Sequence, residues 1–280
     1  MLREALDFPT AGRHGARSLL AGSGFVLVAA VLAGGASYAF DTDRTILAAA
    51  LAALVLLPLL LVRGYYYRAL KTAATAPDPV APSFGGVGSL LRGALAALVV
   101  SAAYALPAGA LFAVAAAARV LPDSWGADAV LVGESLGALA ALVGIAALVG
   151  ALYLVPAATA TMAREGSLRA ALRVRSVGNA AASEDYAVGW VLSVFLQWTL
   201  VPVAAALSAL VVGVVLYFLT GVATRYVWGM SYASSVGVEP EGIDTVGVTP
   251  SSVRRDHDDD TPVGRTDRDP DTERVADEGR

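Results

Sequence analysis

Long apolar runs separated by short polar segments make up residues 1–233. A helix needs about 20 predominantly apolar residues to cross a bilayer, and four runs before residue 164 reach or approach that length. A fifth run, residues 186–228, carries Arg225 as its one charge and would extend about 65 Å as a single helix. Because a hydrocarbon core is about 30 Å thick, this run must fold back near residues 204–210. The predicted spans are 18–40, 45–62, 93–118, 129–163, 186–206 and 208–229.

This pattern predicts an all-α fold, a polytopic membrane helix bundle of about six transmembrane helices arranged as three hairpins. A cleaved signal peptide is the alternative for the first run, because Ser37-Tyr38-Ala39 loosely fits a cleavage site. The leader of 17 residues and the long run that follows it favour a retained helix instead.

Basic residues alternate between the two ends of the predicted spans. Three lie in the leader, four between residues 63 and 92, and four between residues 164 and 175, whereas the opposite connections hold Arg44 and Arg119. Cytoplasmic connections carry the excess of arginine and lysine. We therefore expect a multi-pass protein of the cell (plasma) membrane with both termini in the cytoplasm.

Aromatic and basic side chains mark the predicted membrane surfaces. The segment RGYYYR follows the second span, and a basic segment follows the fourth, where Ser167 is a predicted N-cap for an interfacial helix over residues 168–174. Tyrosines and arginines at such positions anchor helices among the lipid headgroups. The predicted anchors are Arg63, Tyr65, Tyr66, Tyr67, Arg68, Arg164, Arg169 and Arg173.

Composition supports the membrane assignment and separates a tail from it. Hydrophobic residues make up 56% of the 280 residues and charged residues 16%, against about 25% in soluble domains. Residues 234–280 hold 13 acidic and 6 basic residues, a net charge of −7, whereas residues 1–233 carry +3. With few large apolar groups this tail is expected to be disordered. Its acidity argues against nucleic-acid binding and makes it a candidate contact for a protein partner.

Three prolines interrupt the predicted spans, each with polar neighbours. In transporters such breaks free backbone carbonyls that coordinate a substrate near the midplane. A small polar cavity between the third, fourth and fifth spans is one interpretation, and kinks that only shape the bundle are the favoured alternative. The candidate cavity residues are Ser101, Tyr104, Pro107, Pro156, Thr159, Gln197 and Pro202.

Other candidate chemistry is weak. Glu134 is the one carboxylate in a predicted span and lies near its outer end, where it can reach the interface. The aspartates between residues 256 and 267 mimic a calcium loop, but Thr261 occupies the position of its required glycine. His14 and His257 are isolated, and the chain has no cysteine. We therefore expect no metal, no cofactor and no enzymatic activity.

Short phrases in order along the chain resemble domain-of-unknown-function family 4013, a group of archaeal, mainly haloarchaeal, membrane proteins. They cover about residues 1–232 and leave out the tail. The phrases are RGY at 63–65, PSF at 82–84, YALP at 104–107, LVPAA at 154–158, EGSLRAA at 165–171 and DY at 185–186. The resemblance implies a multi-span membrane protein of unassigned activity and assigns no functional residues.

Two functions are compatible with the sequence. The first is a non-enzymatic envelope or scaffold component whose acidic tail recruits a cytoplasmic partner. The second is a small permease or transporter accessory subunit with a polar cavity at the proline-broken helices. Both place the chain in the lipid bilayer.

Overall fold

The computed structural model describes residues 2–13, 15–76, 78–120 and 126–237, and this part of the chain is helical without a strand. Six long helices carry most of it. They are α2 (Gly15–Asp41), α3 (Thr45–Thr75), α4 (Val87–Ala118), α5 (Ala127–Glu165), α8 (Glu184–Ala206) and α9 (Val211–Ser235). All six are long and apolar enough to cross a membrane. The predicted all-α fold with six membrane-capable helices is confirmed.

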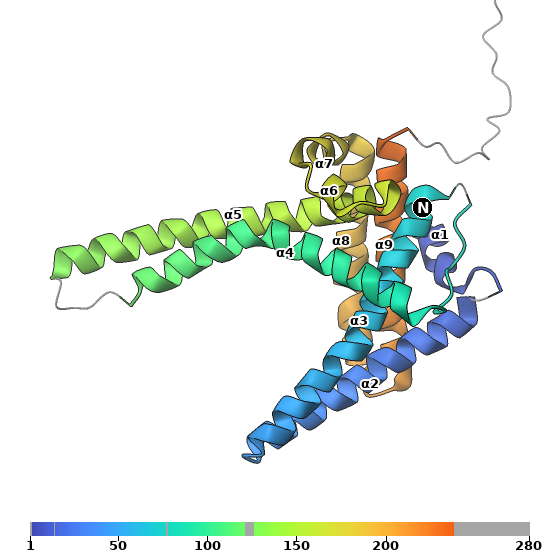
Figure 1. The fold of residues 1–280 in the computed structure, drawn as a ribbon, viewed down its shortest axis with the longest axis horizontal. Coiled ribbons are helices and arrows are strands. Elements are labelled where there is room, and N and C mark those ends of the chain that lie inside the picture. The colour runs from blue at the N-terminus through green and yellow to red at the C-terminus, as the bar shows by residue number, and fades with distance from the viewer. Residues whose placement is uncertain (1, 14, 77, 121–125, 238–280) are drawn as a thin grey trace, which may run out of the picture. The chain divides into compact units, whose positions relative to one another are not determined.

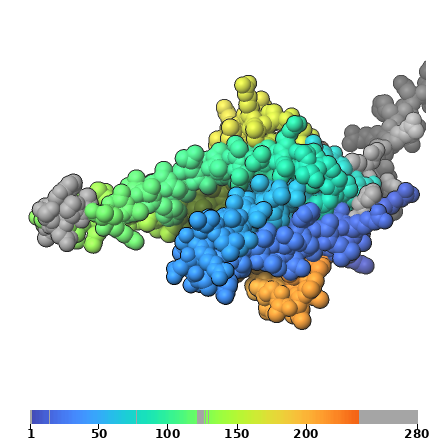
Figure 2. Space-filling model, turned by 60° about the horizontal axis from the view of Figure 1, so that its bottom comes forward, coloured from blue at the N-terminus to red at the C-terminus, as the bar shows by residue number. Residues whose placement is uncertain are grey.

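The long helices pair as three antiparallel hairpins. Helix α2 packs along α3, α4 along α5, and α8 along α9, and the first two pairs are visible in both views (Figures 1 and 2). Short connections join the helices of each pair, including residues 42–44 between α2 and α3 and residues 207–210 between α8 and α9. The last hairpin therefore turns where the length of the apolar run requires it to turn.

Several helix boundaries differ from the sequence prediction; α4, for example, begins at Val87 rather than at residue 93. The second span was expected to end at residue 62, but α3 continues through the RGYYYR segment to Thr75. Nothing in that segment breaks a helix, and α3 ends at Thr75 because the next residue, Ala76, precedes a proline and is extended. Helix α9 ends at Ser235, so the predicted disordered tail lies almost wholly outside the described residues.

Helix α3 contacts four of the other long helices, namely α2, α4, α5 and α9 (Figure 1). Two glycines allow the closest of these approaches. A Cβ on Gly64 would collide with the Leu90 carbonyl of α4, and one on Gly229 of α9 would collide with Ala73 and the Leu70 carbonyl of α3. Small residues at helix crossings let backbones approach in this way. These crossings fix α4 and α9 against α3.

Aromatic rings fill the core next to this crossing. Tyr65 is 1% exposed and stacks on Phe84 at 4.3 Å, and Phe218 of α9 packs against it at 5.4 Å. The N-terminal helices α1 (Leu2–Asp7) and η1 (Phe8–Thr10) close the same core, with Phe8 lying 4.6 Å from the Tyr226 ring. The chain start is thus packed on α9.

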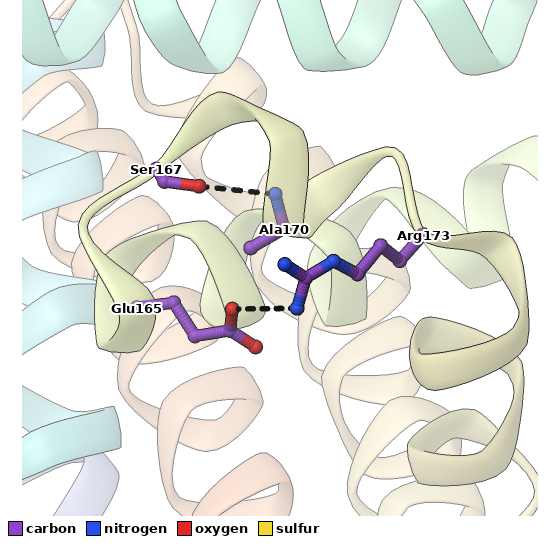
Figure 3. Close-up of polar contacts among 4 residues, drawn as sticks. All are labelled: Glu165, Ser167, Ala170 and Arg173. Carbon is purple, nitrogen blue, oxygen red and sulfur yellow. Dashed lines mark hydrogen bonds and ion pairs between the residues drawn. The ribbon is translucent and has the colours of Figure 1, made fainter.

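A short basic joint connects α5 to α8 through α6 (Leu168–Ala171) and α7 (Val174–Ala181). Ser167 caps α6 as predicted, since its Oγ accepts a hydrogen bond from the Ala170 amide at 3.2 Å, and Arg173 pairs with Glu165 at 3.3 Å (Figure 3). The expected single helix over residues 168–174 is instead two helices. The chain turns at Arg173, whose φ and ψ of −77° and 80° are not helical, and both helices bury their alanines.

Candidate functional site

Pro156 interrupts the hydrogen bonding of α5, and side chains of α8 replace what it removes. Proline has no N–H, so the Leu152 carbonyl loses its helical donor; the Trp190 indole N–H donates to that carbonyl at 3.3 Å. One residue on, the Ala157 amide donates to the Tyr186 hydroxyl at 3.1 Å, and that hydroxyl donates to the Tyr153 carbonyl at 2.7 Å. On the side of α8, the proline break is therefore fully hydrogen-bonded.

The other side of the same break faces a cavity of about 310 Å³ between α3, α4, α5 and α9. Three kinds of side chain line it. The polar ones are Arg63, Ser101, Thr159 and Arg225, and the aromatic ones are Tyr66, Tyr67 and Trp228. Helix α5 contributes an apolar wall that includes Leu148, Leu152 and Val155 beside Pro156. The cavity thus combines two cations with an apolar surface.

Arg63 is held in the cavity by α4. Its Nη2 donates to the Ser101 hydroxyl at 2.6 Å and to the Ala97 carbonyl at 3.3 Å, and the Ser101 hydroxyl donates to the same carbonyl at 2.8 Å. Its Nε is buried without a hydrogen-bond partner, and its Nη1 has no acceptor among the described residues. Helix α4 therefore orients this guanidinium but accepts hydrogen bonds from only one of its three nitrogens.

Arg225 is held by rings rather than by acceptors. Its Cζ lies 4.1 Å from the centroid of the Trp228 ring and 5.3 Å from that of Tyr66. The Trp228 ring is itself fixed, because its indole N–H donates to the Ser193 hydroxyl of α8 at 2.7 Å. Stacking occupies the face of a guanidinium and leaves the N–H donors at its edge free. No described residue accepts a hydrogen bond from Arg225.

Both charges lie far along their helices from the hairpin turns. Arg63 is about 27 Å along α3 from Thr45, and Arg225 is about 21 Å along α9 from Val211, at 1.5 Å per residue. With the hairpin turns at one surface of a hydrocarbon core about 30 Å thick, Arg225 falls about 9 Å and Arg63 about 3 Å inside the opposite surface. No described lining residue is acidic, and no described carboxylate pairs with either arginine. Ionisable groups at such depth are costly and usually functional.

The family described as "Protein of unknown function (DUF4013)" matches residues 46–222 of the chain. The chain belongs to this family. No curated protein and no solved structure matches the chain. The family predicted from the sequence is confirmed, and the matched range contains Arg63, Ser101 and Thr159, whereas Arg225 and Trp228 lie just beyond its end.

The structure brings together three of the seven candidate cavity residues of this DUF4013 protein. Ser101, Pro156 and Thr159 line the cavity. Tyr104 donates its hydroxyl to the Ala171 carbonyl at 2.8 Å, and the Gln197 amide donates to the Ser193 carbonyl at 3.4 Å. Tyr104, Pro107, Gln197 and Pro202 are outside the lining, and both of these prolines are exposed.

The predicted membrane-surface anchors divide into four groups. Arg63, Tyr66 and Tyr67 face the cavity, and Tyr65 lies in the aromatic core. Arg68 is bound by the connection before α4, where its Nη1 donates to the carbonyls of Ser83 and Gly85 at 2.5 and 2.8 Å. The remaining anchors are exposed at the joint after α5; these are Arg164, Arg169 and Arg173.

Sequence reasoning missed the cavity role of Arg225 and Trp228. The available signal was that Arg225 is the one charge in a 43-residue apolar run. The described part of the chain offers no group of three or more His, Asp or Glu residues that could hold a metal ion. The site is therefore defined by its two arginines and its aromatic rings.

Proposed function

We propose that this DUF4013 protein is a non-enzymatic, multi-pass membrane protein that binds a small ligand inside its membrane domain, as a small permease or as an accessory subunit of a transporter. The cavity of about 310 Å³ between α3, α4, α5 and α9 carries the proposal. Ligand sites in helix bundles form between helices and combine an apolar lining with a few oriented polar groups. In transporters they lie beside interrupted helices, and Pro156 lines this cavity.

Cysteine accessibility tests the proposal on a clean background, because the natural chain has no cysteine. Ser101, which is half-buried, and Ala105, which is exposed at the edge of the bundle, both line the cavity. Their neighbour Leu106 is 68% exposed and faces away from the lining, as Gln197 does. In membranes, a water-soluble maleimide should label Ala105→Cys and Ser101→Cys and spare Leu106→Cys and Gln197→Cys.

Labelling of the lipid-facing Leu106→Cys as fast as Ala105→Cys would show that the reagent does not discriminate the cavity. Absence of labelling at both Ala105→Cys and Ser101→Cys, with folded protein present, would remove the permease and accessory roles. The adjacent pair 105 and 106 keeps depth and helix constant, so only the facing direction differs.

The orientation follows from charge. From the positive charge of the basic connections we propose that the leader and the C-terminal end of α9 lie in the cytoplasm and that the protein is in the plasma membrane. A reporter that is active only outside the cytoplasm should be active when it is fused at Asp123. This residue lies outside the described residues. Activity of a cytoplasmic reporter at that position would reverse the orientation. The archaeal origin implied by the family resemblance also stays a prediction.

The scaffold function rests on a separate feature, the tail with its net charge of −7 over residues 234–280. Such a segment is suited to recruiting a basic cytoplasmic partner. Deleting residues 238–280 leaves α9 intact and should remove specific proteins from those that co-purify. An unchanged set would exclude the recruiting function and leave the ligand-binding proposal untouched.

A further inference from the structure

We infer that the cavity binds an anionic amphiphile, with a phosphate or carboxylate head between Arg63 and Arg225 and an apolar tail along α5. The inference rests on the proposed ligand-binding function and names the chemistry of the ligand. It is drawn from the charges that the cavity contains and from the way the surrounding helices hold them.

The first argument is charge balance. Two guanidinium groups line one cavity inside the membrane domain, and none of the described lining residues is acidic. Removing a cation from water without a counter-charge is expensive, and two cations sharing a cavity also repel one another. An anion is the ligand whose binding offsets both costs, whereas a cation would add to them.

The second argument is geometry. Ser101 and Ala97 hold Arg63 through Nη2 only, and Arg225 is held through its face against the Trp228 ring. Both guanidinium groups are oriented by the fold and keep N–H donors that no described residue uses. Arginine edges of this kind match the paired oxygens of a phosphate or carboxylate. The donors are thus fixed before any ligand arrives.

The third argument is the opposite wall. Leu148, Leu152 and Val155 of α5 line the same cavity as the arginines. A small hydrated ion such as inorganic phosphate would leave these side chains without an apolar partner. A ligand with an anionic head and an apolar body satisfies both surfaces. Such chemistry occurs in membrane lipids and in soluble organic anions.

The experiment uses the full chain carrying Ala105→Cys, purified and reconstituted in phosphatidylcholine nanodiscs. The readout is the rate of labelling by N-ethylmaleimide, an uncharged reagent whose access does not depend on the arginines. Phosphatidylglycerol in the nanodisc tests the lipid source, and added phenyl phosphate tests the soluble source. Phenyltrimethylammonium is the matched cation.

We expect phosphatidylglycerol or phenyl phosphate to slow labelling and the cation to leave it unchanged. Slowing by the lipid alone assigns the ligand to the bilayer, and slowing by phenyl phosphate admits a soluble anion. In the same background, Arg63→Gln and Arg225→Gln should each lower the affinity for the protecting ligand by roughly tenfold to a hundredfold. Arg92→Gln, an exposed arginine of α4 outside the lining, should not.

The failures are distinguishable. If Ala105→Cys is labelled but neither anion slows the reaction, or if the cation slows it equally, the anionic ligand is excluded and a ligand-binding cavity remains. If Ala105→Cys is not labelled under any condition, the proposed function fails as well. The comparison of anion with cation leaves both arginines unsubstituted, so it needs no arginine variant to fold.

Discussion

The two sides of the proline break in α5 differ in how their polar groups are satisfied. Toward α8, the Leu152 and Tyr153 carbonyls both receive side-chain donors, at 3.3 and 2.7 Å. Toward α3 and α9, Arg63 is only partly hydrogen-bonded, and Arg225 contacts rings alone. The same interruption thus has a closed side that holds the helices together and an open side with unused donors. Stability is expected from the first side and binding from the second.

The largest expected effect lies on the closed side, at Tyr186. Its ring is 1% exposed and its hydroxyl bridges the Ala157 amide and the Tyr153 carbonyl. Tyr186→Phe leaves buried backbone groups without this partner, which should lower the free energy of unfolding by about 1–3 kcal/mol. The measurement is the thermal midpoint in detergent.

Tyr232→Phe is the matched control for this change. The Tyr232 ring is 5% exposed in the same core, and its hydroxyl has no hydrogen-bond partner among the described residues. Equal losses in the two variants would show that the bridge adds nothing beyond the removal of a tyrosine hydroxyl. Labelling of Ala105→Cys should stay unchanged in Tyr186→Phe, because the cavity lies on the other side of α5.

Sequence patterns predicted the closed side only in part. Pro156 marked the break, since a proline within an apolar run must free a carbonyl. Tyr186 and Trp190 could not be assigned to it, because the rotation and register of α8 against α5 depend on packing along the whole hairpin pair. The six long helices, in contrast, follow from the lengths of the apolar runs, which the bilayer thickness constrains directly.

The open side was harder to predict, for a geometric reason. Arg63 and Arg68 lie in one RGYYYR segment, and five residues at 100° each place them about 140° apart around α3. One arginine therefore binds the connection before α4 while the other faces the cavity. The sequence shows that the two point to different faces, but only the crossings at Gly64 and Gly229 decide which face is inside.

The next effect in size belongs to the open side and has the opposite sign. Arg225 has ring contacts but no hydrogen bond or ion pair to a described residue. Replacing it by methionine removes an uncompensated charge and keeps an apolar side chain of similar length. The free energy of unfolding of ligand-free protein should rise by about 1 kcal/mol, because the desolvation cost of the charge exceeds its ring contacts.

Arg92→Met controls for a general effect of removing an arginine, and its exposed position should keep the change within about 0.5 kcal/mol. A clear loss of stability in Arg225→Met, with Arg92→Met unchanged, would mean that Arg225 serves the fold as Tyr186 does. The distinction between the two sides of α5 would then be lost.

The smallest effect returns to the closed side, at Trp190. Its indole N–H donates to the Leu152 carbonyl at 3.3 Å, longer than the usual 2.9–3.0 Å of an N–H···O bond. Trp190→Phe keeps an aromatic ring against Tyr153, which the indole meets edge to face at 5.3 Å, and removes the donor. The expected loss is about 0.5–1 kcal/mol, below that of Tyr186→Phe, because the freed carbonyl loses one long bond rather than a bridge. Trp198→Phe, at a position 80% exposed, gives the change in the free energy of unfolding that comes from removing an indole alone. If Trp190→Phe costs no more than that, only the Tyr186 bridge contributes to the closed side.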